Sequence, residues 1–191
     1  MTPLNLAAGF AVGLLVFVVV FLAVATYNSV VALRQRIRRA WANIEVVLQQ
    51  RHDELPNLVA AVRGVMAFEQ SVLDDVTRLR GQWSQDQSVA DQAVASEATT
   101  RAVRQLFAVV ERYPDLKSQG NVASLQTEIE RLEAMIADRR ELYNDSVYRY
   151  NARIGQLPGI VLAAILGWAP LPFFKADPAD TARPDVSLTA A

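Results

Sequence analysis

The best candidates for chemistry in this chain lie in one short stretch, "RHDELP", at residues 51–56. His52 is the only histidine, and it stands beside Asp53 and Glu54, which could suggest a metal site. A metal site needs several ligands that converge in space, however, and the chain has one histidine and no cysteine. Di-iron helical bundles need Glu-x-x-His pairs on facing helices, which a single histidine cannot supply. We therefore predict no metal site and no cofactor.

Glu69 is the second candidate, because it falls on an otherwise apolar helical seam. A buried carboxylate without a partner would be protonated or strongly destabilising. Glu69 is therefore interpreted either as a paired or rim-exposed charge, or as a site where a cation of a partner docks. The sequence contains no glycine-rich phosphate loop, nucleophile elbow or paired-carboxylate arrangement. We predict that the protein is not an enzyme and has no small-molecule substrate, with a hydrolase or metalloenzyme as the alternative.

An apolar N-terminal run precedes these residues. After a short tail of residues 1–5, residues 6–26 read "LAAGFAVGLLVFVVVFLAVAT", without one charged side chain. A helix of roughly 20 such residues crosses a hydrocarbon core of about 30 Å. The alternatives are a buried core helix and a cleaved signal peptide, because Ala23-Val24-Ala25 resembles a cleavage site. No lysine or arginine precedes the run, so we predict an uncleaved single-pass anchor.

A block of arginines, made of Arg34, Arg36, Arg38 and Arg39, follows the apolar run closely. Basic residues beside a span are normally retained in the cytoplasm. We therefore predict that the N-terminus faces outward and that the rest of the chain is cytoplasmic, with an exported arrangement as the alternative. The same arginines are candidates for contact with anionic lipid headgroups, at about 1 kcal/mol each near the surface. The membrane lipid bilayer is thus an expected partner.

The overall charge excludes one class of partner. The chain has 19 lysine and arginine residues against 20 aspartate and glutamate residues, for a net charge of −1. Nonspecific binding to nucleic acid needs a clustered excess of basic residues. We therefore predict no nucleic-acid partner.

Apolar residues recur at spacings of three and four along most of the chain after the span, which is typical of amphipathic helices that need partner helices. No comparable stretch alternates with period two, so no sheet is expected. The predicted fold is all-α: the transmembrane helix continues into an antiparallel four-helix up-and-down bundle at residues 27–157. The last bundle helix has a charged face that is interpreted as solvated; it comprises Glu130, Glu133, Asp138, Arg139 and Arg140. The four seams contain Leu33, Ile37, Ala40, Ile44 and Val47; Leu58, Val62, Val65, Glu69, Val72, Val76, Leu79 and Trp83; Val89, Ala93, Ser96, Thr100, Val103, Phe107 and Val110; and Leu125, Ile129, Leu132, Ile136, Tyr143, Val147, Tyr150 and Ile154.

Polar runs, prolines and glycines mark the expected helix ends. "SQDQS" at 84–88 supplies serines suited to helix caps. Pro114 and Gly120 separate the third helix from the fourth, with Asn121 as a plausible N-cap. "QLPG" at 156–159 ends the fourth helix in the same way.

Pro56 lies within "RHDELP" and decides where the first bundle helix ends. A proline in a helix interior costs about 3 kcal/mol, unless it lies in the first turn. Asp53 is a good N-cap three residues earlier. We therefore predict that the chain reverses near Pro56, with one long helix kinked at Pro56 as the alternative.

Long motifs in the chain resemble the LemA family. They are Tyr27-Asn28 followed by "VALRQRIRRAWANIEVVLQQRHDELPNLVAAVRG", then "LFAVVERYPDLKS", "YNDSVYRYNARIGQLPG" and "PFF" at 172–174. This resemblance, which reaches to about residue 176, implies a membrane anchor and a four-helix up-and-down bundle in a bacterial membrane protein, and it implies no defined activity. The family's usual Tyr-x-x-His-Glu is replaced by Val65-Met66-Ala67-Phe68-Glu69, so the histidine of that motif is missing here.

The C-terminal part of the chain carries "GIVLAAILGWAPLPFF" at 159–174. Its apolar run of about ten residues is too short to span a bilayer. We expect the segment 158–174 to pack on the bundle, and the alternative places it in the membrane interface with Trp168, Phe173 and Phe174 as anchors. Residues 175–191 are polar and interrupted by prolines, so a disordered tail is expected.

Together these features predict a non-enzymatic, membrane-anchored helical scaffold or adaptor of the bacterial envelope, located in the inner membrane. Protein partners of unknown identity are expected. The alternative is a lipid-interacting protein that organises the membrane itself, based on the arginine block and the C-terminal aromatic residues.

Overall fold

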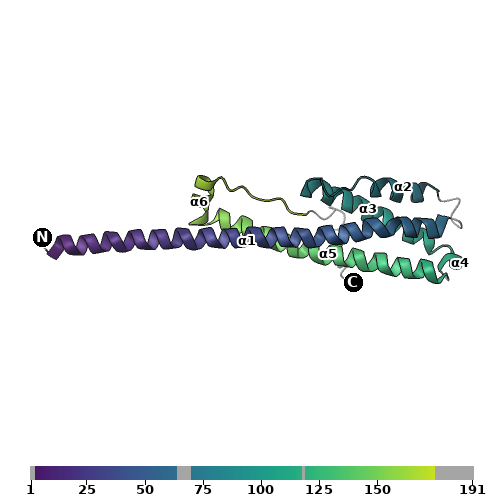
Figure 1. Ribbon diagram of the computed structural model, residues 1–191, viewed down its shortest axis with the longest axis horizontal. Coiled ribbons are helices and arrows are strands. Elements are labelled where there is room, and N and C mark those ends of the chain that lie inside the picture. The colour runs from purple at the N-terminus through teal and green to yellow at the C-terminus, as the bar shows by residue number, and fades with distance from the viewer. Residues whose placement is uncertain (1–2, 64–69, 118, 175–191) are drawn as a thin grey trace, which may run out of the picture. The chain divides into compact units, whose positions relative to one another are not determined.

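The computed structural model describes residues 3–63, 70–117 and 119–174, and every regular element within these ranges is a helix (Figure 1). The predicted all-α class is therefore confirmed. The predicted tail at 175–191 lies outside the described residues. The helices are α1 (Pro3–Arg63), α2 (Gln70–Arg80), α3 (Val89–Val110), α4 (Pro114–Lys117), α5 (Gly120–Gly155) and α6 (Gly159–Leu166).

The chain divides into two compact units. The first combines Met1–Asn43 with Glu141–Phe173, and the second combines Ile44–Arg140 with Phe174–Ala191. Helices α1 and α5 each contribute to both units.

The first part of α1 has the properties of a membrane span. Within the described ranges it belongs to the one helix that is long and apolar enough to cross a bilayer. From Phe10 to Leu22 its side chains are exposed around the whole helix. The core helix of a soluble protein would bury one face of such a run, so the core-helix interpretation does not fit. A signal sequence has the same length and composition, and remains the alternative to an anchor.

The predicted chain reversal at Pro56 is wrong, because Pro56 lies inside α1. Proline has no backbone N–H, so the carbonyl of His52, four residues earlier, loses its helical donor. Arg80 of α2 supplies the missing donor, with its Nε 2.9 Å from the His52 carbonyl oxygen. Asp53 is therefore not an N-cap, and its carboxylate instead accepts a hydrogen bond from Gln49 at 2.9 Å. The proline is accommodated by a residue from another helix.

The second unit has an apolar core to which α1, α2, α3 and α5 all contribute, together with Leu116 of α4. Helices α2 and α3 lie side by side along this core (Figure 1). Several residues of the predicted seams are buried in it, which confirms the helical periodicity in the described ranges. The buried core residues are Leu55, Leu58, Val59, Val62, Leu73, Val76, Ala102, Val103, Leu106, Val109, Val110, Leu116, Val122 and Ile129.

Local capping signals place the helix ends close to where they are predicted. Ser88 is the N-cap of α3, and its hydroxyl accepts a hydrogen bond from the backbone N–H of Asp91 at 3.2 Å. Helix α5 begins at Gly120, one residue before the predicted cap, and ends at Gly155, directly before "QLPG". The connection between α3 and α5 contains the short α4, which is not predicted from the sequence.

In the first unit, α1 and α5 run antiparallel. Arg153 of α5 donates a hydrogen bond from Nη2 to Thr26 Oγ1 of α1 at 3.3 Å. Farther along α1, the ring of Trp41 meets the ring of Tyr143 edge-on, with 5.6 Å between centroids. Residue numbers therefore fall along α5 as they rise along α1. Tyr143, which lies on the predicted fourth seam, is buried by this packing.

Two glycines define the short helix α6 that follows α5. Gly159 opens α6 so close to the end of α5 that a Cβ at this position would overlap the backbone carbonyl oxygen of Arg153. Gly167 ends α6 with a φ of +66°, in the left-handed region that favours glycine. The backbone N–H of Trp168 donates to the Ala163 carbonyl at 3.0 Å and completes this cap.

Residues 168–173 run back along α5, and side chains of α5 bind their backbone groups. Asn151 donates from Nδ2 to the Leu171 carbonyl and accepts at Oδ1 from the Leu171 N–H, both at 2.9 Å. The hydroxyl of Tyr150 donates to the Ala169 carbonyl at 3.1 Å. An extended segment makes no internal hydrogen bonds, so these side chains satisfy its polar groups and fix its position on α5.

Candidate functional site

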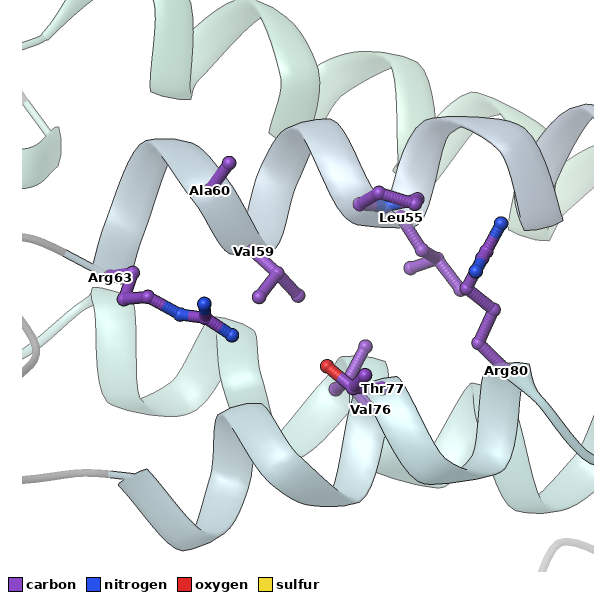
Figure 2. Close-up of a pocket in the computed structure, with 8 residues that line it drawn as sticks. Leu55, Val59, Ala60, Arg63, Val76, Thr77 and Arg80 are labelled. Carbon is purple, nitrogen blue, oxygen red and sulfur yellow. The ribbon is translucent and has the colours of Figure 1, made fainter.

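A pocket of about 230 Å³ lies between the C-terminal part of α1 and α2 in the second unit (Figure 2). Leu55, Val59 and Val76 supply its apolar lining. Figure 2 shows Arg63 and Arg80 on opposite sides of this lining. The full lining comprises Leu55, Pro56, Val59, Ala60, Arg63, Val76, Thr77 and Arg80.

Helical spacing brings these side chains together. Leu55, Val59 and Arg63 follow one another at intervals of four residues and so share one face of α1. Val76 and Arg80 share a face of α2 for the same reason. The hydrogen bond from Arg80 to the carbonyl exposed by Pro56 joins the two helices at one side of the pocket.

The lining residues include no carboxylate, histidine, lysine or tyrosine, which are the usual groups for acid–base catalysis. The Thr77 hydroxyl donates to the Leu73 carbonyl at 2.9 Å, so its proton is already used within α2. Arg63 and Arg80 each present a guanidinium group, which has several N–H donors and no acceptor. The apolar lining matches an apolar side chain, and the two guanidinium groups match a carboxylate close to that side chain.

The predicted candidates in "RHDELP" do not assemble a metal site. The ring of His52 lies against Trp83, with 5.4 Å between centroids, and its Nδ1 is 3.3 Å from Asp53 Oδ1. Hydrogen bonds from Gln49 and then from His52 hold the pKa of Asp53 below its ordinary value. Within the part of the chain that the structure describes, no group of three or more histidines and carboxylates is placed to hold a metal ion.

A buried polar network centred on Arg51 is absent from the sequence-based predictions. Arg51 is only 3% exposed, and its Nη1 lies 2.9 Å from Thr100 Oγ1 and 2.8 Å from Glu133 Oε1. Its Nη2 donates to Ser96 Oγ at 3.0 Å. The assignment of Glu133 to a solvated face is therefore wrong. The only sequence signal was the presence of Ser96 and Thr100, one helical turn apart on an apolar seam.

Arg140 is the second charged residue that the sequence wrongly assigns to the solvated face of α5. It forms an ion pair with Glu97 of α3, which is itself buried. Its guanidinium also lies over the ring of Phe174, with 4.5 Å between Cζ and the centroid. Phe174 is buried, so it is not a lipid-facing anchor.

The four arginines of the block lie in two different environments. Arg34 donates a hydrogen bond to the Tyr150 hydroxyl at 3.3 Å, and its guanidinium lies 5.9 Å from the Trp168 ring centroid. Arg36, Arg38 and Arg39 are exposed. These three residues therefore stay candidates for lipid headgroup contact, whereas Arg34 has a structural role in the first unit. Glu69, the other predicted site, lies outside the described residues.

The described ranges thus form an all-helical protein with one apolar helix of transmembrane length and a pocket of about 230 Å³ between α1 and α2. The chain belongs to the LemA family, whose model matches residues 40–188. The family predicted from the motifs is therefore confirmed. The match includes the pocket-lining residues of α1 and α2 and the two helices, α3 and α5, whose side chains bind Arg51.

Similar proteins carry a name that refers to an organelle. The chain is 28% identical to magnetosome proteins MamQ 1 and MamQ 2 of Paramagnetospirillum magneticum, over 93% of this chain and 77% of each relative. It is 26% identical to magnetosome protein MamQ of Magnetospirillum gryphiswaldense, over 80% of this chain and 66% of that relative.

Proposed function

We propose that this protein is a non-enzymatic, membrane-anchored helical scaffold or adaptor of the bacterial envelope. The proposal rests on α1, because this single helix contains the apolar run and also supplies Leu55, Leu58 and Val62 to the core of the second unit. An anchor of this kind raises the effective concentration of the attached unit for partners in the same membrane. The family and the magnetosome proteins among the relatives favour a structural role over a catalytic one.

We further infer that residues 27–157 form an antiparallel four-helix up-and-down bundle. The shared core of α1, α2, α3 and α5 and the short connection between α2 and α3 support this arrangement. Residues 158–174 then form a separate C-terminal element whose extended part, residues 168–173, packs on α5, which is supported by the contacts of Asn151 with Leu171.

The pocket between α1 and α2 is the proposed docking site for a partner protein. Its apolar floor takes an apolar side chain, and Arg63 and Arg80 provide positive charge on either side. The partner segment is therefore expected to combine an apolar anchor residue with aspartate or glutamate within one helical turn.

Site-specific photocrosslinking in native membranes tests this proposal. A photoreactive amino acid at Ala60, which lines the pocket, is compared with the same amino acid at Val94, an exposed position on α3. A discrete adduct at Ala60 only, reduced several-fold by Arg63→Glu and mapping to an acidic, apolar peptide, supports the proposal. Equal labelling at both positions, or an adduct insensitive to Arg63→Glu, contradicts it.

The proposal also includes location and orientation. We place the protein in the inner membrane with its N-terminus outside, because Arg36, Arg38 and Arg39 closely follow the apolar run and basic residues beside a span are normally retained in the cytoplasm. Protease treatment of intact spheroplasts that carry a C-terminal tag tests this orientation. The tag should survive until the cells are lysed, whereas its loss before lysis indicates the exported arrangement.

A second candidate function is organisation of the membrane lipid itself. The exposed Arg36, Arg38 and Arg39 favour it, since basic side chains beside a span attract anionic headgroups. The test is to extract the full chain with its surrounding lipid and measure the headgroup classes. Enrichment of anionic lipid that disappears when all three arginines are replaced by glutamine supports this function, and identical lipid profiles contradict it.

A further inference from the structure

Helix α6 presents an apolar surface that the first unit does not cover. Ile160, Val161, Ile165 and Leu166 are exposed, and Ile165 is exposed by 72%. No charged side chain occurs between Arg153 and Lys175. A contiguous apolar surface of this kind is unfavourable in water and marks contact with a partner or with a membrane.

The residues before and after α6 both contact α1 at the point where its apolar run ends. Before α6, Arg153 donates a hydrogen bond to Thr26, the last residue of the run, at 3.3 Å. After α6, the ring of Trp168 packs on the ring of Tyr27, with 5.9 Å between centroids. Tyrosine and tryptophan are enriched at the boundary between the hydrocarbon core and the headgroups. The segment that contains α6 therefore starts and ends beside the same part of α1.

The geometry of α6 fits a membrane surface rather than a second crossing. Eight residues of helix are about 12 Å long, far less than the hydrocarbon core of about 30 Å. Figure 1 shows α6 beyond the end of α5, running across the direction of α1 before the chain turns back. A helix held across the direction of a span at its end lies along the interface.

Contacts of the segment that follows α6 hold this helix in place beside α1. The hydroxyl of Tyr150 binds the Ala169 carbonyl, and Asn151 binds the backbone of Leu171 at both its N–H and its carbonyl. Arg34 lies beside both Tyr150 and Trp168. Polar side chains of α1 and α5 therefore fix the segment after α6, whereas the side chains of α6 itself are apolar.

We propose that α6 is a second membrane contact, an interfacial helix whose exposed apolar side chains insert into the lipid leaflet beside the end of the α1 span. The proposal rests on α1 being a membrane anchor and goes beyond the scaffold function, because it gives the protein two attachments to the same membrane. The bilayer is the favoured occupant, since Arg153 before α6 and Trp168 after it contact Thr26 and Tyr27, at the end of the exposed apolar run of α1.

Fluorescence of single-cysteine variants in liposomes tests this inference, because the natural chain has no cysteine and each label is therefore unique. An environment-sensitive label is placed at Ile165→Cys on α6 in the full-length protein. Phe17→Cys in the apolar run is the lipid reference, and Leu142→Cys on α5 is the water reference; the two natural side chains are 67% and 64% exposed. Aqueous iodide and lipids with quenchers on their acyl chains are then compared at each position.

The label at Ile165→Cys is expected to behave as the one at Phe17→Cys, with emission at shorter wavelength, strong quenching by the lipid quencher and at least several-fold less quenching by iodide than at Leu142→Cys. Iodide quenching equal to that at Leu142→Cys overturns the proposal. Protection from both quenchers also overturns it, because protein then covers α6. If Phe17→Cys itself reports water, the anchor fails; if only Ile165→Cys does, the anchor stands and the interfacial helix fails.

Discussion

Pro56 should be tolerated inside α1 because Arg80 replaces the hydrogen-bond donor that proline lacks. The Nε of Arg80 lies 2.9 Å from the carbonyl oxygen of His52, which the N–H of residue 56 would otherwise bind. Hydrogen bonds to charged groups contribute about 1.5–3 kcal/mol, and the partial exposure of Arg80 places the expected loss near the lower end. Arg80→Met, which keeps a long apolar side chain, should therefore lower the free energy of unfolding by about 1–2 kcal/mol.

A double-mutant cycle separates this bond from other roles of Arg80. In Pro56→Ala, the restored N–H of residue 56 can bind the His52 carbonyl, so Arg80→Met should cost about 1 kcal/mol less in that background. The four full-length proteins are unfolded by urea in one detergent and followed by tryptophan fluorescence, because Trp83 lies beside His52. Arg78→Met is the matched control on α2: Arg78 forms an exposed pair with Asp75 at 2.9 Å, so its loss should cost less than about 0.5 kcal/mol. An equal cost of Arg80→Met with and without Pro56 would show that Arg80 does not replace the donor that proline lacks.

Three further predictions concern the buried network, an ionisable side chain and a close backbone approach. Arg51→Met should lower the free energy of unfolding by about 3 kcal/mol, because it leaves Glu133 without its cation, and adding Glu133→Gln should recover part of this loss in the same urea assay. Burial raises the pKa of Tyr143 above its ordinary value of 10.0, so the stability it contributes is fully present below pH 10 and is lost as the pH rises through the folded-state pKa. Tyr143→Phe should reduce the loss of unfolding free energy at alkaline pH. An unchanged dependence of this free energy on pH would contradict the raised pKa of Tyr143. Gly159→Ala should cost about 1–3 kcal/mol and increase proteolysis at the α5–α6 turn, whereas Gly155→Ala, where a Cβ meets nothing within 4 Å, should leave the turn intact.

Much of the fold follows from local sequence signals. Ser88 caps α3 with its own hydroxyl, and α5 ends directly before "QLPG", because capping and helix termination depend on residues close in the chain. Residues of the apolar seams such as Leu58, Val76 and Val103 are buried because helical periodicity alone determines which face they share.

The wrong predictions share one physical cause. Pro56 ends a helix by local rules, but Arg80 lies on another helix and removes the penalty of an unpaired carbonyl. Glu133 has the sequence context of a surface charge, yet it pairs with Arg51, which is far away in the chain. Periodicity identifies the face of a helix, whereas partners for buried polar groups come from the packing of several helices.

The pocket between α1 and α2 illustrates the same limit. Arg63 and Leu55 share a face of α1 that the sequence pattern indicates, and Val76 and Arg80 share one of α2. The prediction of a reversal at Pro56 would have ended α1 before Val59 and Arg63, so it would have removed one wall of the pocket.

The central claim, that the apolar run is a retained anchor, is tested most directly by the intact mass of the protein recovered from its membrane. A C-terminally tagged chain is purified from alkaline-washed membranes and from the soluble fraction, and each is measured by mass spectrometry. A retained anchor predicts that the protein in the membranes still contains residues 6–26, so that its mass includes the apolar run. A soluble product that begins at Thr26, after Ala23-Val24-Ala25, would show that the run is a cleaved signal peptide and would contradict the account.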